Sequence, residues 1–304
     1  MEAVTLKNIT KVYGKAKTVA VNKVSFTVDK GELFGLIGPD GAGKTSVFRI
    51  LTTLLLPDEG TATVDGFDVV KDYKKIRSTV GYMPGKFSLY PDLTVEENLN
   101  FFATVFNTTI QDNYHLIKDI YIQIEPFKKR RSGMLSGGMK QKLALCCALI
   151  HKPTVLFLDE PTTGVDPVSR KEFWEMLKQL KEQKITIVVS TPYMDEANLC
   201  DRIALIQTGK VLSVDTPANI IKSYPEQLYS IRADNMPALL KALNSYDEVL
   251  SSYAFGEYTH VSFKSIYVDL GAVKNYLNQH GLTGIVLQKT VATIEDSFIK
   301  LLKS

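Results

Sequence analysis

The chain has 304 residues, of which 45% are hydrophobic and 23% charged, and its formal net charge is +3. This composition is typical of a globular protein with a sizeable core, in one large domain or two ordinary ones. A net charge this small does not argue for nucleic acid as a partner, so we expect none. No apolar run approaches the about 18 residues that a membrane-spanning helix needs.

The terminus and the cysteines indicate where the protein works. The first residues, "MEAVTLKNIT", contain neither the basic nor the apolar region of a signal peptide. Three cysteines, with Cys146 next to Cys147, suit a reducing cytoplasm and no disulfide framework. The four histidines show no metal-ligand spacing. We therefore predict a cytosolic protein.

The amino-terminal elements begin with strands. Residues 1–35 alternate between apolar and polar, which predicts strands in "AVTLKNIT" and "VNKVSFTVDKGELFGLIG". The stretch "GAGKTSVFRILTTLLLPDEG" is predicted to be a helix that ends at Pro57, and "GTATVDGFDV" to be a short sheet segment. From Thr94 to about Ile124 the period becomes helical, and Thr94 with Glu97 forms a capping box.

A parallel unit follows. The apolar runs "TVLFLDE" and "ITIVVST" flank the helical pattern "DPVSRKEFWEMLKQLKEQ", and this order predicts a βαβ unit that is buried on both faces. Before it, Lys128, Lys129, Arg130 and Arg131 form a basic block, which is either a solvated surface turn or a docking patch. We expect a domain of residues 1–222, with a helical subdomain of about residues 85–152.

The last part of the chain predicts a second, small domain. Strand patterns in "EQLYSIRA", "YDEVLSSYAF", "THVSFKS" and "GIVLQKT" alternate with the helical "MPALLKAL" and "VDLGAVKNYLNQHG", and the amphipathic "IEDSFIKLLKS" closes the chain. Residues 223–304 are therefore predicted to form an α+β module. It contains no constellation that suggests chemistry.

A phosphate-binding loop is predicted between a strand and a helix. "GPDGAGKT" fits the pattern G-x-x-x-x-G-K-[ST] in the strand–helix context that this motif requires. Its glycines let consecutive N–H groups point at an anion, and Lys44 can reach the β and γ phosphates while Thr45 ligates Mg²⁺. The alternative is a chance match in a glycine turn. The predicted ATP-binding residues here are Gly38, Pro39, Asp40, Gly41, Ala42, Gly43, Lys44, Thr45 and Ser46.

Two carboxylates are predicted to supply the acidic groups that the phosphate loop lacks, one for Mg²⁺ and one for the attacking water. The apolar strand "TVLFLDE" delivers Asp159 at its carboxyl end, where it can hold Mg²⁺ directly or through water. Glu160 comes next and can polarise the water that attacks the γ-phosphate, so we predict it to be catalytic. The alternative for each acid is an ordinary residue at a strand end.

A second anion-binding helix end is predicted at "LSGGMKQ". Ser136 and two glycines open a helix that continues "LALCCALI", so its N-terminus can also bind an anion. One chain cannot easily bring both helix ends to one phosphate. The second end therefore suggests a nucleotide held by another subunit.

The order of "GPDGAGKT", "LSGGMKQ", "LFLDEPTTGVDP" and "STPYMDEA" resembles an ABC-family ATPase over the whole chain. The resemblance implies an α/β fold with a P-loop NTPase-type core sheet, an antiparallel β subdomain, a helical subdomain and the small C-terminal α+β domain. It implies two such domains that stack head to tail around two MgATP molecules, each loop facing the partner's signature. The signature residues are then Leu135, Ser136, Gly137, Gly138 and Met139.

The same resemblance gives roles to two further residues. Tyr13 in "KVYGK" corresponds to the aromatic residue that stacks on adenine, although a lone tyrosine in a strand is more often packed surface. Asp166 in "TTGVDP" matches the acidic residue that couples the two sites.

Within the family, "VGYMP", "FSLYPDLTVEENL" and the ending "EDSFIKLL" look like ATPase subunits of ABC-2 exporters, of the multidrug-export type. Such subunits dock through the helical segment around residues 85–130 onto separately encoded membrane permease subunits. The resemblance thus implies an ATP hydrolase that lies peripherally on the cytoplasmic face of the membrane. The transported substrate is not readable from the chain.

Two positions depart from the family's pattern. Gly85 stands where the family has a glutamine that contacts Mg²⁺ and the attacking water, and Pro192 stands where it has a histidine that bonds the γ-phosphate. Proline has no side-chain donor and no N–H, and glycine has no side chain. We therefore expect this chain's own site to turn over slowly while its signature serves a different partner.

Other interpretations stay open on the sequence alone. Pro192 could simply end a strand while a water does the histidine's work, Gly85 could be an engineered change, or the alignment could be off by one residue. A homodimer would carry two impaired sites. A regulatory nucleotide-binding module that gates a partner is the main alternative function, and a soluble ABC ATPase acting on ribosomes or DNA is a third.

Overall fold

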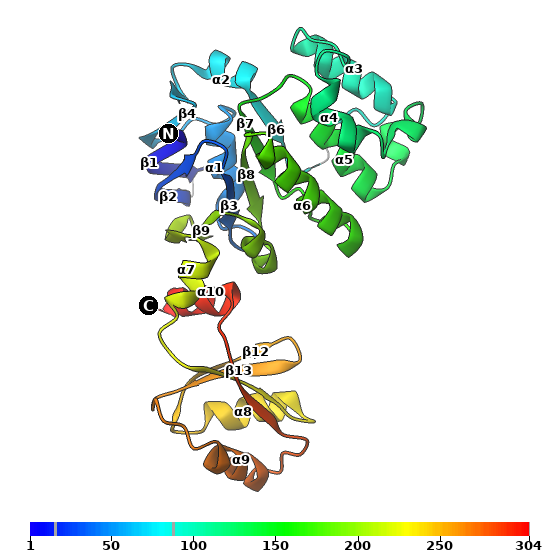
Figure 1. Ribbon diagram of the computed structural model, residues 1–304. Coiled ribbons are helices and arrows are strands. Elements are labelled where there is room, and N and C mark those ends of the chain that lie inside the picture. The colour runs from blue at the N-terminus through cyan, green and yellow to red at the C-terminus, as the bar shows by residue number, and fades with distance from the viewer. Residues whose placement is uncertain (15–16, 87–88, 304) are drawn as a thin grey trace. The chain divides into compact units, whose positions relative to one another are not determined.

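The computed structural model describes residues 1–14, 17–86 and 89–303, and the chain divides into two compact units, Met1–Pro217 and Ala218–Ser304. Figure 1 shows the elements of each unit. The predicted helical subdomain, about residues 85–152, includes residues 87 and 88, which lie outside the described part. Among the described residues, no helix has the length and apolar character to cross a membrane.

A six-stranded sheet forms the centre of the first unit, in the order β10-β9-β3-β8-β7-β6. Its strands are β3 (Leu33–Ile37), β6 (Val80–Met83), β7 (Val155–Asp159), β8 (Thr186–Thr191), β9 (Arg202–Gln207) and β10 (Lys210–Asp215). All neighbours pair in parallel except β10 with β9. Every residue of β3, β7 and β8 is buried, because helices or a second sheet cover both faces.

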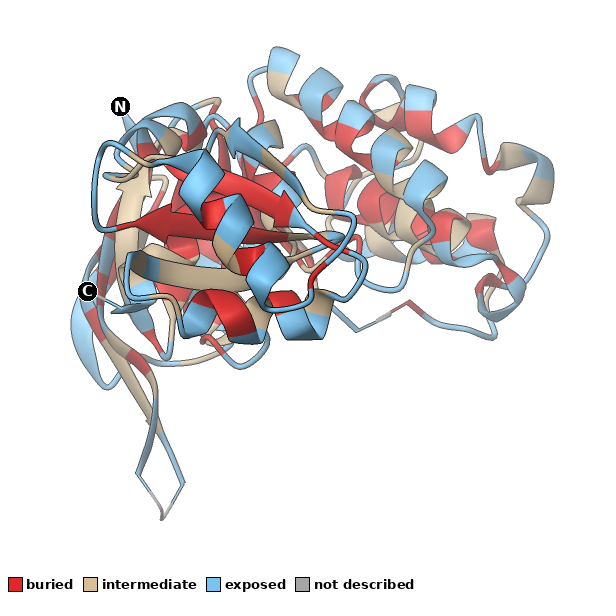
Figure 2. Cartoon of the chain, turned by 90° about the horizontal axis from the view of Figure 1, so that it is seen from below, coloured by how far each residue is buried: buried red, intermediate tan, exposed pale blue. Residues whose placement is uncertain are grey.

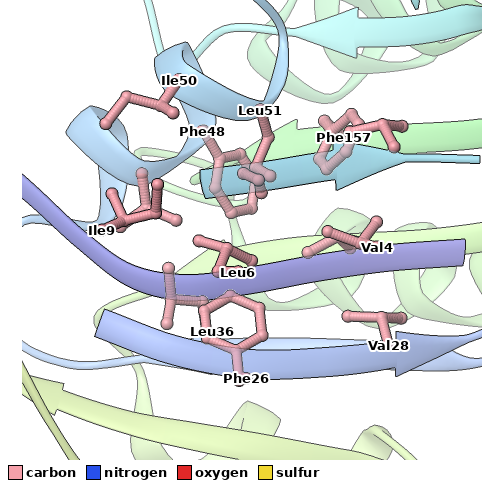
Figure 3. Packing of buried hydrophobic residues seen from close by; sticks show 14 of the residues in the cluster. Val4, Leu6, Ile9, Phe26, Val28, Leu36, Phe48, Ile50, Leu51 and Phe157 are labelled. Carbon is pink, nitrogen blue, oxygen red and sulfur yellow. The ribbon is translucent and has the colours of Figure 1, made fainter. Parts of the chain in front are cut away.

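An antiparallel sheet in the order β2-β1-β4-β5 packs beside it. Its strands are β1 (Glu2–Tyr13), β2 (Thr18–Asp29), β4 (Glu59–Val64) and β5 (Phe67–Asp68). Helix α1 (Lys44–Leu51) packs into the same core, with the Phe48 ring edge-on to Phe157 at 5.8 Å between centroids. Figure 3 shows Phe48 and Leu51 above Leu6 of β1. The start of α1, which carries the phosphate loop, thus stands on a packed core.

The remaining helices of the first unit are α2 (Tyr73–Thr79), α3 (Val95–Val105), α4 (Tyr114–Tyr121), α5 (Gly137–Leu149) and α6 (Pro167–Glu182), with 3-10 turns η1 (Glu125–Phe127), η2 (Ser132–Met134) and η3 (Met194–Leu199). Helices α3, α4 and α5 gather as a helical group (Figure 1). The predicted capping box of Thr94 and Glu97 is present. The helical pattern from Thr94 to Ile124 is interrupted, because Asn107 takes a positive φ of 53°.

The helix after the phosphate loop is shorter than predicted. It ends at Leu51, six residues before Pro57, although the apolar residues run on to Leu56. Thr53 takes a left-handed φ of 63°, which stops the helix. Arg77 stabilises this turn, since its Nε and Nη2 donate to Thr53 Oγ1 and to the Thr53 carbonyl, both at 2.8 Å. A tertiary contact therefore overrode the apolar pattern.

The second unit is an antiparallel sheet in the order β12-β13-β11-β14. It contains β11 (Leu228–Arg232), α8 (Met236–Asn244), β12 (Val249–Phe255), β13 (Tyr258–Phe263), α9 (Leu270–Gln279), β14 (Val286–Thr290) and α10 (Ile294–Lys303), and α7 (Pro217–Lys222) bridges the boundary. A βαββαβ chain with this order is the ferredoxin-like arrangement. Residues of α8 and α9 form one core with one face of the sheet, and helices in Figure 2 carry buried and exposed residues on opposite sides.

The predicted fold class is confirmed: a parallel core sheet, an antiparallel β subdomain, helices and a C-terminal α+β part are all present. The two units divide after Pro217 rather than at the predicted residue 222. The accessory role predicted for residues 223–304 stays a prediction.

Candidate functional site

The loop between β3 and α1 has a backbone that excludes side chains at several points. A Cβ atom at Gly38 would lie 2.1 Å from the Ile206 carbonyl oxygen, and one at Gly43 would lie 2.3 Å from that of Ala20. Gly43 also has a φ of +105°, a region that favours glycine. Gly38 and Gly43 therefore lie in close backbone contact with β9 and β2, just before the start of α1, where the N–H groups of a helix N-terminus can bind an anion.

The Lys44 side chain is held inside this loop. Only 3% of the residue is exposed, and its Nζ donates to the carbonyls of Gly38 at 2.7 Å and Pro39 at 3.1 Å. The same Nζ lies 3.1 Å from Glu160 Oε1. The ammonium group therefore lies between the phosphate loop and the carboxylate predicted to be catalytic.

Asp159 ends β7 beside this cation. It is 2% exposed, and its Oδ1 accepts from Ser190 Oγ at 2.5 Å and from Thr45 Oγ1 at 3.3 Å. Burial raises the pKa of Asp159 above its usual range, while the hydrogen bonds from Ser190 and Thr45 act in the opposite direction. A buried carboxylate beside a threonine hydroxyl is a set of hard oxygen ligands, which fits Mg²⁺.

Glu160 has an unusual backbone for a residue with a side chain. Its φ is +51°, a conformation that costs energy and that is concentrated at functional sites. Its N–H bonds both the carbonyl and the hydroxyl of Ser190 at 3.0 Å. The strained conformation is thus fixed by β8, and it turns the carboxylate toward Lys44.

Both departures from the family's pattern lie at this site. A Cβ atom at Gly85 would lie 3.0 Å from the Asp159 carbonyl oxygen and 3.7 Å from Glu160 Cβ. Pro192 directly follows Thr191, whose carbonyl accepts from the Gly38 N–H at 3.2 Å. Each position is therefore next to the phosphate loop or its carboxylates, and neither offers a polar side chain there.

Tyr13 lies near the start of α1. Its hydroxyl is 3.2 Å from Ser46 Oγ, and the residue is 37% exposed at the end of β1. A half-exposed ring beside the phosphate loop is free to stack on a base. The adenine-stacking role itself stays a prediction.

The predicted signature begins α5, in the helical group of Figure 1 and apart from α1. Ser136 is its N-cap, and its hydroxyl accepts from the Met139 N–H at 3.3 Å. Gly138 permits close packing, since a Cβ there would lie 2.6 Å from Ser169 Oγ. Among the described residues, no hydrogen bond or ion pair joins residues 135–139 to residues 38–46. That this second helix end faces a nucleotide held by another subunit stays a prediction.

Asp166 has a local function in the structure. Its carboxylate caps α6 by accepting from the Ser169 N–H at 3.0 Å, and this hydrogen bond lowers the pKa of Asp166. The coupling role between two sites stays a prediction.

The sequence interpretation missed three residues that organise this site: Ser190, Thr191 and Glu196. Ser190 pairs in register with Asp159 across the parallel strands β7 and β8. The two apolar runs that predicted these strands end at neighbouring positions, so their alignment was a signal that could have found Ser190. The buried Glu196 carried no signal, because acidic residues in a helical turn are usually solvated.

The comparisons with known proteins identify the family of the chain. Residues 21–163 match the family model described as ABC transporter. The chain is 37% identical to the probable multidrug ABC transporter ATP-binding protein YbhF of Escherichia coli, covering 98% of the chain and 52% of the relative, and so spans about half of that relative's length. It is 36% identical to the Nod factor export ATP-binding protein I of Burkholderia lata, covering 98% of the chain and 96% of the relative.

Solved structures give the same result for the fold. The ATP-binding cassette MJ0796, solved as a dimer in a post-hydrolysis state with ADP and Pi, superposes with a TM-score of 0.64 at 27% identity, over 70% of this chain and 98% of that one. The predicted resemblance is therefore confirmed. The chain belongs to the ABC transporter family.

Proposed function

We propose that the chain is the ATP-binding subunit of an ABC-2 type exporter and works peripherally on the cytoplasmic face of the membrane. It binds MgATP at a head-to-tail dimer interface and couples binding and hydrolysis to transport by separate membrane subunits. Relatives named for multidrug export and for Nod factor export support the assignment to exporters.

One observation carries the proposal: Lys44, Thr45, Asp159 and Glu160 converge at the phosphate loop, with Lys44 Nζ 3.1 Å from Glu160 Oε1. Thr45 and Asp159 would hold Mg²⁺, which supplies charge neutralisation at the phosphates. Lys44 would exchange its carbonyl partners for phosphate oxygens, and Glu160 would orient the attacking water and accept its proton.

The site is proposed to retain bound ATP for a long time, because it hydrolyses ATP slowly. Gly85 and Pro192 lie where polar side chains would position water, and losing such a group typically costs about 10²–10³ in rate. The neighbouring hydrogen bonds, from Ser190 to Asp159 and from the Gly38 N–H to Thr191, are present. The signature at the start of α5 then serves a competent site on a different ABC subunit.

The membrane subunits are proposed to dock at a cavity of about 190 Å³ between the core sheet and the helical group. Apolar residues from both sides line it, among them Leu54, Leu89, Phe102 and Phe106. Leu54 is 56% exposed, so part of this apolar lining is open to solvent, which supports a surface that a partner covers.

A regulatory module that binds ATP and gates a partner without meaningful turnover is the second candidate. The absence of side-chain donors at Gly85 and Pro192 favours it. Glu160 argues against it, because the structure fixes this residue in a strained conformation beside Lys44.

Reconstitution with candidate ABC-2 membrane subunits tests the proposal. We expect the purified chain to bind MgATP and to hydrolyse it slowly, and turnover to rise when the membrane subunits and a second, different ABC subunit are present. Copurification with only itself at a full ATPase rate would contradict the asymmetric arrangement. ATP binding with no turnover in any assembly would favour the regulatory module.

A further inference from the structure

The first unit contains a buried carboxylate that no step above uses. Glu196, in η3, is 1% exposed. Its Oε1 accepts from Thr162 Oγ1 at 2.8 Å and from Arg170 Nε at 2.9 Å, and its Oε2 accepts from Thr191 Oγ1. Burying a charge is costly unless it is paired and hydrogen-bonded, so this saturated arrangement fixes all four residues in one geometry.

The partners of Glu196 come from the segments that carry the reaction. Thr162 lies two residues after Glu160, and Thr191 is the last residue of β8. The Thr191 carbonyl accepts from the Gly38 N–H at 3.2 Å, and the preceding Ser190 bonds both Asp159 and the Glu160 N–H. The end of β8 is therefore the common support of the phosphate loop and of both carboxylates.

Arg170 of α6 completes the arrangement around Pro192. Its Nη2 lies 2.6 Å from Asp195 Oδ2, and its guanidinium lies 4.3 Å from the centre of the Tyr193 ring. Arg170 and Glu196 thus fix the chain on both sides of Pro192, where the side chain itself contributes no hydrogen bond. A planar guanidinium suits this combination of ion pair and stacking.

We propose that Glu196, paired with Arg170, is a positioning residue for ATP hydrolysis. It holds the end of β8, so that the hydrogen bonds from the Gly38 and Glu160 N–H groups to this strand keep the phosphate loop and the Glu160 carboxylate in place. The pair acts through Thr191 and Ser190 and does not touch the nucleotide. In this chain it takes over, through the backbone, part of the ordering that a polar side chain at position 192 would give. The inference rests on the proposed ATPase function and extends it to residues of the motif stretches that had no assigned role.

The chain offers a matched control at the opposite end of the same sheet. Glu32 is 8% exposed and lies 3.3 Å from Arg202 Nη1, and this pair stands at the amino ends of β3 and β9. Glu32→Gln removes a buried carboxylate from an arginine in the same unit, as Glu196→Gln does. A merely structural role predicts that the two variants behave alike.

The test measures single-turnover ATP hydrolysis, with enzyme in excess, for the native chain, Glu196→Gln, Arg170→Gln, the double variant and Glu32→Gln. We expect Glu196→Gln to lower the rate about tenfold while the half-saturating MgATP concentration changes less than about twofold, as for loss of a transition-state interaction. Because Glu196 and Arg170 act as one unit, the double variant should lose little more than either single one. Glu32→Gln should lower the melting temperature and leave the rate unchanged.

Amide hydrogen exchange tests the same proposal without a measurement of turnover. We expect faster exchange at Gly38 and Glu160 in Glu196→Gln and not in Glu32→Gln, because only the first variant loosens the end of β8. Equal rates and equal exchange in the two variants would overturn the proposal. A native chain that hydrolyses no ATP would contradict the function proposed above, whereas the exchange result would still decide the role of Glu196.

Discussion

Two buried aspartates, one in each unit, are held in opposite ways. Asp296 of α10 is fully buried: its Oδ1 accepts from His260 Nδ1 and the Tyr253 hydroxyl at 2.7 Å, and its Oδ2 accepts from the Thr293 N–H and hydroxyl. Asp159 of β7 is as deeply buried, but both of the hydrogen bonds that the described residues give it go to Oδ1.

The difference appears in the acidity of the two groups. Burial alone would raise the pKa of Asp296, but the bonds from His260, Thr293 and Tyr253 outweigh it and hold that pKa below its usual value. Burial dominates at Asp159 and raises its pKa. The saturated carboxylate of Asp296 therefore serves the fold of the second unit, whereas Asp159, with fewer donors, leaves room for a cation at the site.

Glu160→Gln tests the predicted catalytic residue next to Asp159, and a large effect on the rate is expected. The variant keeps the shape of the side chain and removes the base, so single-turnover hydrolysis should fall about 10²–10⁴-fold while MgATP still binds. Rapid-quench assays with labelled ATP measure the rate. Glu175→Gln, on the exposed part of α6, is the control, and an equal loss in that variant would remove the special role of Glu160.

Asparagine at each aspartate tests the comparison itself. Asp296→Asn should destabilise the second unit by about 2–3 kcal/mol, because it weakens hydrogen bonds to a charged group, and should leave ATP hydrolysis unchanged. Asp159→Asn should change stability by less than about 1 kcal/mol, because burial already disfavours its charge, yet abolish Mg²⁺-dependent turnover. Urea unfolding and ATPase assays check both. Similar stability losses for the two variants would refute the distinction.

The smallest expected effect is the dependence of the unfolding free energy on pH. The native pKa of Asp296 lies below its unfolded value of 3.8, so its contribution is present above that value and is lost as the pH falls through the native pKa. The native pKa of Asp159 is raised, so its contribution is full below 3.8 and is lost as the pH rises through the native pKa. Between about pH 6 and about pH 3, the unfolding free energy of the native chain relative to each asparagine variant should therefore change in opposite directions. Parallel changes would contradict these assignments.

The sequence predicted the motifs of the site better than the buried residues that hold these motifs in place. The phosphate loop and the strand that delivers Asp159 follow a local pattern, and the strand–helix–strand order places their ends at one edge of the sheet. The Glu196 cluster joins residues up to 34 positions apart through a buried turn. No periodicity in the sequence encodes such a contact. The early end of α1 was missed for a similar reason, because the turn at Thr53 is stabilised by the distant Arg77.

In the second unit, the alternation of strands and helices predicted every element from β11 to α10. The saturated cluster around Asp296 was not foreseen, because it pairs a closing helix with a strand 36 residues earlier. Local patterns predicted many elements of both units, although not α2, β9 and β10 of the first unit. Buried polar contacts between distant segments could be found only in the folded chain.

Single-turnover hydrolysis by the native chain, beside Gly85→Gln, Pro192→His and the double variant, tests the central claim most directly. The account predicts that the double variant gains about 10²-fold or more while ATP affinity barely moves. Pro192→His should contribute more than Gly85→Gln, whose Cβ would crowd the Asp159 carbonyl oxygen at 3.0 Å. A native chain that already hydrolyses ATP briskly, with variants that gain nothing, would contradict the claim and make a simple homodimeric exporter motor the better account.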